Sequence, residues 1–167
     1  MIRFGILIIS DRSFRGERED LTAPVLSGSI TRSGYAVVKQ QIVPDEVAAI
    51  SSTLIEWSDF NVVDVILTSG GTGFSSRDVT PEATLAVVER LAPGISEAIR
   101  AFSLQKTPHA ILSRAVSGIR KRTLIINLPG SPKGALESLE LVLPVLAHAV
   151  ELLQDSPDAE KGHNVTV

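Results

Sequence analysis

The sequence predicts a three-layer α/β/α fold in which helices cover both faces of a mostly parallel central sheet. Two observations lead to this fold class. Short apolar runs, typical of buried strands, alternate along the chain with segments in which apolar residues recur every three or four positions. Polar segments directly follow four of those runs, as expected where parallel strands end at one edge of a sheet. With 167 residues, the chain is long enough for one domain with a substantial core.

The first half of the chain is expected to form three strands separated by two helices. Short apolar runs predict strands at 3–10, 35–43 and 62–68. Between them, apolar residues spaced by three or four predict helices at 20–33 and 47–57. One face of the second helix carries Val47, Ile50, Leu54 and Trp57.

The second half of the chain is expected to contain more helix. The apolar spacing predicts helices at 80–91, from Gly94 onward and, in short form, from Pro108. Apolar runs at 115–119 and 123–128 predict two further strands. These elements complete a sheet that helices cover on both sides.

The final helix is expected to begin at Pro132, with Ser131 as its N-cap, because proline suits the first helical position. Pro144 lies inside this helix and is expected to kink or divide it. Residues 1–154 are therefore expected to form a single domain. The polar segment 155–167 is expected to be a flexible C-terminal tail.

Composition and charge exclude several classes of protein. The formal net charge of −3 argues against a nucleic-acid-binding protein, which normally carries a basic face. The absence of cysteine excludes disulfides, thiolate nucleophiles and zinc–thiolate sites. No apolar stretch approaches the roughly 20 residues that a membrane helix needs, and the apolar N-terminal run is too short for a signal peptide. The chain is therefore expected to act in the cytoplasm without nucleic-acid or membrane partners.

Residues 68–84, TSGGTGFSSRDVTPEAT, form the most distinctive segment. Gly70, Gly71 and Gly73 allow the backbone to approach a ligand closely, and successive N–H groups in such a turn form a nest for an anion. The segment lacks the Gly-Lys-Ser/Thr ending of a P-loop and the third glycine of a dinucleotide fingerprint. Two interpretations stay open at this point: a phosphate site of another kind and a plain strand-to-helix turn.

Arg77 and Asp78 favour the phosphate site. An arginine beside a glycine nest binds a phosphate well, often through two parallel hydrogen bonds. A phosphate repels a nearby carboxylate unless a metal ion lies between them, and Mg²⁺ held by one or two carboxylates and substrate phosphates is the usual arrangement. The alternative is that Asp78 or Thr80 caps the following helix, with Arg77 as a surface partner.

Asp45 follows the second predicted strand and is the second candidate for a metal ligand. It lies at the same edge of the predicted sheet as Asp78, so the pair could hold one Mg²⁺ for phosphoryl or nucleotidyl transfer. The alternative for Asp45 is capping of the next helix. Two further segments, 10–13 and 129–133, follow strands at this edge and could contact a ligand. The alternative for 10–13 is that it is simply solvated. The alternative for Ser131 is capping of the final helix.

These motifs together resemble the MoaB/Mog family of molybdenum cofactor biosynthesis. The resemblance rests on SDR at 10–12, PDE at 44–46, GGTG and RDVTPEAT within 68–84, and AILSRAVSGIRKRTLIINLPGSPK at 110–133. It covers residues 3 to about 153. The sequence is most similar to the bacterial members that adenylylate molybdopterin, and gephyrin contains a related domain.

The resemblance implies a Mg²⁺-dependent molybdopterin adenylyltransferase that uses ATP and molybdopterin as substrates and releases pyrophosphate. The functional aspartates of the family match Asp45 and Asp78, which would be the catalytic residues and the metal ligands. The positions that would bind substrates are Thr68, Ser69, Gly70, Gly71, Thr72, Gly73, Arg77, Thr80, Pro81, Glu82, Gly130, Ser131, Asp11, Arg12 and Ser13. A homotrimer and a downstream molybdate-inserting protein, similar to MoeA, are also implied. The alternative that stays open is a non-catalytic, MoaB-like molybdopterin-binding or scaffold protein.

Overall fold

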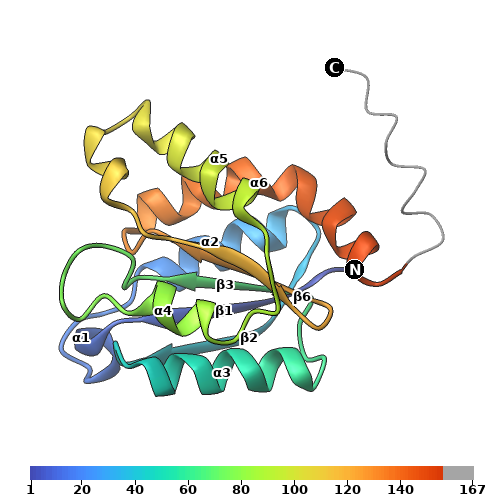
Figure 1. Cartoon of the computed structure of the whole chain (residues 1–167), viewed down its shortest axis with the longest axis horizontal. Helices are drawn as coiled ribbons and strands as arrows, with labels where there is room; N and C mark the ends of the chain where they lie inside the picture. The colour runs from blue at the N-terminus through green and yellow to red at the C-terminus, as the bar shows by residue number, and fades with distance from the viewer. Residues whose placement is uncertain (156–167) are drawn as a thin grey trace.

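Six strands form one mixed sheet in the computed structural model of the chain, which describes residues 1–155 (Figure 1). The order across the sheet is β2-β1-β3-β6-β5-β4. The strands are β1 (Arg3–Ile9), β2 (Ala36–Val43), β3 (Val65–Ser69), β4 (Arg90–Leu91), β5 (Ser117–Arg120) and β6 (Thr123–Leu128). β2, β1, β3 and β6 run parallel, whereas β5 and β4 each run antiparallel to their neighbour. The predicted α/β class with a mostly parallel sheet is confirmed.

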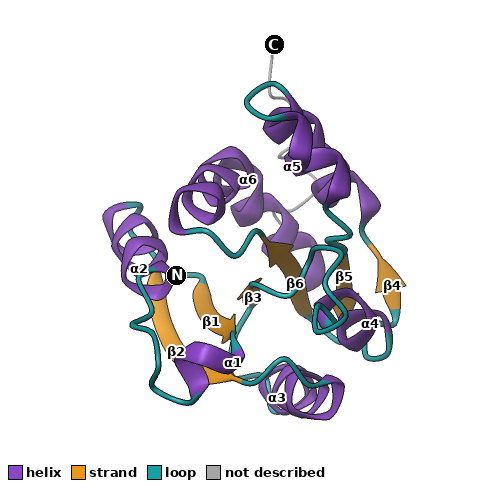
Figure 2. Cartoon of the chain, turned by 90° about the vertical axis from the view of Figure 1, so that its left-hand side faces the viewer, coloured by secondary structure: helices purple, strands orange, loops and turns teal. Residues whose placement is uncertain are grey.

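Helices cover both faces of this sheet (Figures 1 and 2). The helices on one face are α2 (Thr22–Arg32), α5 (Pro93–Leu104) and α6 (Pro132–Leu153). Those on the other face are α3 (Val47–Asp59) and α4 (Thr80–Leu85). Two short helices, α1 (Asp11–Phe14) and the 3₁₀ helix η1 (Pro108–Leu112), lie in the connections. Of the predicted tail 155–167, all but Asp155 lies outside the described residues, and the domain boundary at 154 stays a prediction.

The central strand β1 shows why its sequence is a continuous apolar run. Successive side chains of a strand point to opposite faces of the sheet, and here both faces are covered. Phe4 and Ile6 join the apolar cluster beneath α2 and α6, whereas Leu7 and Ile9 join the cluster beneath α3. All four side chains are buried. From Ile6 to Ile9 the strand therefore needs an apolar residue at every position.

The predicted helix at 80–91 is wrong in its second half. α4 ends at Leu85, and the chain then forms β4, whose register pairs Arg90 with Ile119 of β5. The Glu89 N–H donates to the Ile119 carbonyl oxygen over 2.8 Å. Leu85 and Leu91 are 47% and 59% exposed, so their helical spacing does not mark a buried face. In this segment, backbone hydrogen bonds to the edge of the sheet take the place of helical hydrogen bonds. A further helical turn without a buried face would add little stability.

Pro144 does not divide α6, which is continuous from Pro132 to Leu153. An internal proline costs a helix about 3 kcal/mol because it removes one backbone hydrogen bond and crowds the preceding turn. The buried face of α6 extends on both sides of the proline, with Leu139 and Val142 before it and Leu146 and Val150 after it. Packing of this face against the sheet outweighs the local cost.

No helix within residues 1–155 combines the length and the apolar character that a membrane crossing requires.

Asp64, just before β3, is 3% exposed and is held by Arg3 of β1. The Arg3 guanidinium donates to both carboxylate oxygens, at 2.7 and 3.2 Å, and the Arg3 N–H donates over 2.8 Å. Burial alone would raise the pKa of the Asp64 carboxyl. The hydrogen bonds and positive charge of Arg3 reverse this effect and lower the pKa below its ordinary value.

We expect Arg3→Met to lower the free energy of unfolding at neutral pH by about 2 kcal/mol, because it leaves a buried carboxylate without its cation. Since the folded-state pKa of Asp64 is lowered, the pair stabilises the protein above about pH 4 and loses this effect as the pH falls through the folded-state pKa. Urea denaturation at neutral and acidic pH should therefore show a difference between the two proteins that shrinks in acid. Lys39→Met, at an exposed position of strand β2, is the control and should leave the free energy of unfolding unchanged at both neutral and acidic pH. A difference that grows in acid would contradict this assignment.

Candidate active site at the carboxyl edge of the sheet

Loops that follow the four parallel strands surround one cavity of about 720 Å³. The lining comes from the ends of β1 and β3, from Asp45 after β2, and from 130–132 after β6, together with the segment 18–22 that leads into α2. In a parallel sheet, all strands of the same direction end at one edge, so segments far apart in sequence meet there. This is the edge at which the sequence predicted a ligand site.

The glycine loop 70–73 adopts a conformation that only glycine tolerates well at its first two positions. Gly70 and Gly71 have φ values of +106° and +64°. A Cβ atom on Gly70 would overlap the carbonyl oxygen of Ile9, and one on Gly71 would overlap the hydroxyl of Thr80. The loop can therefore lie directly against the end of β1.

The carbonyl groups of the glycine loop are all occupied by the protein itself. The Thr80 hydroxyl donates to Gly70 O over 2.8 Å, and the Thr80 N–H donates to Gly71 O over 3.1 Å. The N–H of Arg114 donates to Thr72 O over 2.9 Å, and its guanidinium donates to Gly73 O over 2.8 Å. By contrast, the N–H groups of residues 71–73 have no hydrogen-bond acceptor among the residues that the structure describes. The loop therefore offers donors and no free acceptors, which suits an anion.

Neither Asp78 nor Thr80 caps α4, so the capping alternative is wrong for both. The N-cap position belongs to Val79, which makes no side-chain capping bond. The Asp78 carboxylate accepts a hydrogen bond from the Ser75 N–H over 2.9 Å, inside the same loop. Thr80 is fully buried, and its hydroxyl holds Gly70. Both side chains shape the loop instead of the helix end.

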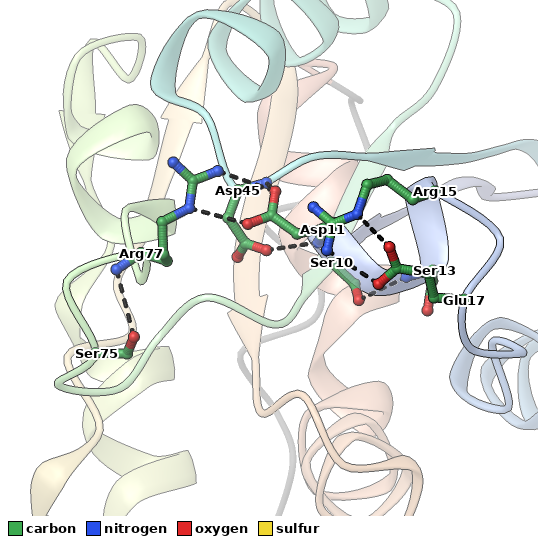
Figure 3. A network of polar contacts seen from close by, with 8 residues as sticks. All are labelled: Ser10, Asp11, Ser13, Arg15, Glu17, Asp45, Ser75 and Arg77. Carbon is green, nitrogen blue, oxygen red and sulfur yellow. Dashed lines mark hydrogen bonds and ion pairs between the residues drawn. The ribbon is translucent and has the colours of Figure 1, made fainter.

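Asp45 does not cap α3 either. The N-cap of that helix is Glu46, without a side-chain bond. The Asp45 carboxylate instead accepts a hydrogen bond from the Asp11 N–H over 2.7 Å, and the Asp45 N–H donates to the Asp11 carboxylate over 3.0 Å (Figure 3). Burial raises the pKa of the Asp45 carboxyl; the Asp11 N–H opposes this, and the negative charges of Asp11 and Asp78 raise the pKa further.

Arg77 pairs with Asp11. The alternative in which Arg77 is a surface partner of its neighbour Asp78 is therefore wrong. Its Nε and one terminal nitrogen each donate to a different carboxylate oxygen of Asp11, both over 2.9 Å (Figure 3). The Arg77 guanidinium lowers the pKa of the Asp11 carboxyl. This ion pair brings the only arginine of the glycine-loop segment to the mouth of the cavity, where its side chain is 55% exposed.

The two aspartates fit a magnesium ion that is shared with substrate phosphates. Asp45 and Asp78 both line the cavity, and they are close enough to each other that the negative charge of Asp78 raises the pKa of the Asp45 carboxyl. Within residues 1–155, no group of three or more His, Cys, Asp or Glu residues could hold a metal without further ligands. Mg²⁺ commonly takes one or two carboxylates and completes its shell with water and phosphate oxygens. The donor set present here matches that pattern.

The structure brings ten of the predicted site residues to the wall of this cavity. They are Asp11, Arg12, Asp45, Ser69, Gly70, Gly71, Arg77, Asp78, Gly130 and Ser131. Ser131 also accepts a hydrogen bond from the Gly134 N–H over 3.1 Å, so its predicted capping of α6 is confirmed.

The other predicted positions lie behind the cavity wall or beside it. Thr68 is fully buried, and its hydroxyl accepts a hydrogen bond from the Asn127 amide over 2.9 Å. Glu82 forms an ion pair with Arg114. The Ser13 hydroxyl is buried without a hydrogen-bond partner. The remaining positions in this group are Thr80 and Pro81, which are buried, and Thr72 and Gly73, which line a second cavity.

The second cavity, of about 360 Å³, lies beside the first and was not predicted from the sequence. The end of the glycine loop, α5, η1 and the start of α6 line it, with Lys106 and His109 among its polar residues. Gly130 and Ser131 line both cavities. No local pattern marks α5 and η1 as part of a site, because they reach it only through the packing of the helices.

The segment 18–22 and Arg114 were also missed. Arg18 and Asp20 line the first cavity, and the Asp20 carboxylate accepts hydrogen bonds from the first N–H groups of α2, at 2.9 and 3.1 Å. Arg114 donates to the carbonyl oxygens of Gly73 and Asp78 and pairs with Glu82. An arginine just before a predicted strand gives no sign of this role in the sequence.

The chain is similar in sequence and in structure to proteins of molybdenum cofactor biosynthesis. A family model described as "Probable molybdopterin binding domain" matches residues 5–148. The molybdopterin adenylyltransferase of Escherichia coli K12 is 45% identical over 141 residues, which are 83% of this chain and 72% of that protein. The molybdenum cofactor synthesis protein cinnamon of Drosophila melanogaster is 43% identical over 155 residues; these are 92% of this chain, which spans only 26% of that longer protein.

A solved structure shows the same architecture. The crystal structure of the molybdopterin biosynthesis enzyme MoaB from Thermus thermophilus superimposes with a TM-score of 0.88 at 51% sequence identity. The match covers 94% of this chain and 99% of that one. The residues matched by the family model, 5–148, include every residue that lines the first cavity.

Proposed function

Since the chain belongs to the molybdopterin-binding domain family of molybdenum cofactor biosynthesis, we propose that it is a molybdopterin adenylyltransferase. One observation carries the proposal beyond the family. The glycine loop offers its N–H groups with every carbonyl occupied, and the carboxylates of Asp45 and Asp78 lie in the same cavity as Arg77. Anion donors, a cation and two metal-binding carboxylates are the groups that transfer between two phosphates requires.

The proposed reaction joins two anions. A phosphate oxygen of molybdopterin attacks the α-phosphorus of ATP, and the bond between that phosphorus and the oxygen leading to the β-phosphate breaks. Adenylyl-molybdopterin forms, and pyrophosphate leaves with the bonding electron pair. The attacking phosphate is already ionised at neutral pH, so no general base is needed. The site has to hold the two substrates in line and stabilise the charge that gathers on the transferred group.

The residues of the cavity divide this work. Gly71 lines the first cavity, and Thr72 and Gly73 line the second one beside it. The N–H groups of these three residues would bind phosphate oxygens, and Arg77 adds a positive charge. Asp45 and Asp78 would hold Mg²⁺. When bound, the ion would neutralise part of the phosphate charge as the bond to the leaving pyrophosphate breaks. Ser69, the last residue of β3, and Ser131, the N-cap of α6, would contact molybdopterin.

The assembly and the cellular setting are part of the same proposal. The resemblance that supports the reaction also supports a homotrimer that works in the cytoplasm. Its product would pass to a MoeA-like protein that inserts molybdate. Size measurement by light scattering tests the trimer independently of the chemistry.

Incubation of the purified chain with molybdopterin, ATP and Mg²⁺ is expected to yield adenylyl-molybdopterin and an equal amount of pyrophosphate. Mass spectrometry detects the first product and a coupled phosphate assay the second. Omission of Mg²⁺ should abolish both products. Molybdopterin binding without any ATP-dependent pyrophosphate release would instead support a non-catalytic, MoaB-like binding or scaffold protein.

A further inference from the structure

Asp11 joins three of the loops that surround the first cavity (Figure 3). Its own position follows β1, its hydrogen bonds reach Asp45 after β2, and its ion pair reaches Arg77 in the loop after β3. These partners are 34 and 66 positions away in the sequence. No other residue in the described part of the chain makes hydrogen bonds to both Asp45 and Arg77.

The link between Asp11 and Asp45 fixes the place of Asp11. Asp11 is the first residue of α1, so its N–H has no partner within the helix and is free to donate elsewhere. It donates to the Asp45 carboxylate over 2.7 Å, and the Asp45 N–H returns a bond of 3.0 Å. Ser10 caps α1 by accepting the Ser13 N–H over 3.2 Å and so holds this turn in place. Two reciprocal bonds and a capped turn make Asp11 a rigid acceptor.

The link between Asp11 and Arg77 fixes the arginine. Both oxygens of the Asp11 carboxylate accept from the Arg77 guanidinium, at 2.9 Å each. Asp11 is the only side chain within the described residues to which the Arg77 guanidinium donates. Arg77 is 55% exposed, and a long exposed side chain without a partner samples many rotamers. The bidentate pair therefore selects one orientation of the guanidinium at the cavity.

We propose that Asp11 is a positioning residue for adenylyl transfer. It orients the Arg77 guanidinium toward the phosphate that is transferred and does not bind a substrate itself. The proposal rests on the adenylyltransferase function proposed above. Both carboxylate oxygens of Asp11 are occupied, and a carboxylate repels a phosphate, so direct contact with a substrate phosphate is unfavourable. Its contribution lies in the orientation of its partner, which is already set before the substrates bind.

The expected kinetic result separates this role from a structural one. Asp11→Ala should lower kcat by roughly three- to tenfold, the effect of freeing one long side chain. The KM for ATP should stay the same or fall, because the variant removes a negative charge that competes with the phosphate for Arg77. Asp11→Asn still accepts hydrogen bonds from Arg77 and from the Asp45 N–H, so it should fall between wild type and Asp11→Ala. A merely structural role would raise KM and lower the melting temperature.

A double-mutant cycle tests whether Asp11 acts through Arg77. If it does, Asp11→Ala should have little further effect on kcat in a chain that already carries Arg77→Ala. Glu17→Ala is the matched control, since it breaks the exposed Arg15–Glu17 ion pair of 2.7 Å on the same loop without touching the cavity lining (Figure 3). It should leave kcat and KM unchanged.

The possible outcomes are distinct. Active wild type with an unchanged kcat in Asp11→Ala, or additive effects of Asp11→Ala and Arg77→Ala, overturns the positioning role. If Asp11→Ala does not fold, the cycle is run with Asp11→Asn, and additivity there has the same meaning. A wild-type protein that forms no adenylated product overturns the proposed function itself.

Discussion

Replacement of Asp78 with asparagine is expected to lower the rate of adenylyl transfer by about 10²–10³-fold, the usual effect of losing one electrostatic contact to a phosphoryl-transfer transition state. Asparagine keeps the shape of the side chain and can still accept the Ser75 N–H, so the glycine loop should keep its conformation. What is lost is the charge that would hold Mg²⁺ beside the phosphates. The expected defect is therefore in catalysis and not in folding.

Binding of molybdopterin separates this account from general damage to the site. Removal of a carboxylate from a cavity that receives an anion lessens repulsion, so Asp78→Asn should bind molybdopterin as well as wild type does or better. Fluorescence titration in the absence of ATP measures this directly. Glu97→Gln, an exposed acidic residue of α5, is the control for loss of one negative charge and should be fully active. Full turnover by Asp78→Asn would exclude the metal-binding role.

Gly70→Ala is expected to lower the free energy of unfolding by about 3–5 kcal/mol and to abolish adenylyl transfer. Gly70 has a φ of +106°, which an L-residue rarely adopts, and the added methyl group would overlap the Ile9 carbonyl oxygen at the end of β1. Neither group can move alone, because Ile9 belongs to the central sheet and Gly70 is tied to Thr80. Denaturant titration measures the loss of stability, and the mass-spectrometric assay measures the loss of activity.

Substitutions at two other glycines separate the cost of the backbone conformation at Gly70 from the cost of the steric overlap. Gly16 has a φ of +74° but no heavy atom within 4 Å of an added Cβ, so Gly16→Ala should cost only about 1 kcal/mol for the backbone conformation. Gly94, in the first turn of α5, has open space and no positive φ, so Gly94→Ala should be neutral or stabilise by a few tenths of a kcal/mol. A cost at Gly70 equal to that at Gly16 would show that the steric overlap is relieved by small movements.

The sequence predicted five of the six strands, a mostly parallel sheet and the edge at which the loops meet, because these follow from short-range patterns. Period and length mark a buried strand, and intervening helices impose parallel pairing on the strands they connect. Asp45 and Asp78 could be placed at one edge for that reason alone. The error at 80–91 arose because Leu85, Val88 and Leu91 have helical spacing, although pairing with β5 decides the backbone there.

Side-chain partners across the site could not be predicted in the same way. Helix capping was the alternative left open for Asp45 and Asp78, since an aspartate before a helix often caps it. The structure gives both a different partner, and the choice depends on distances between loops that no local pattern encodes. The pairing of Arg77 with Asp11 instead of the adjacent Asp78 is another example. Such contacts follow from the sheet order and become visible only once the loops are in place.

The occupied carbonyl groups of the glycine loop bear on how such a loop could be grafted onto another protein. The four residues 70–73 owe their one-sided display of N–H groups to Thr80 and Arg114, which lie outside the loop. Arg114 is 41 positions away from Gly73, whose carbonyl oxygen it holds. Transplanted alone, the glycines would regain free carbonyls and lose their preference for anions. The portable unit is therefore a discontinuous one, made of the loop, its threonine and a distant arginine.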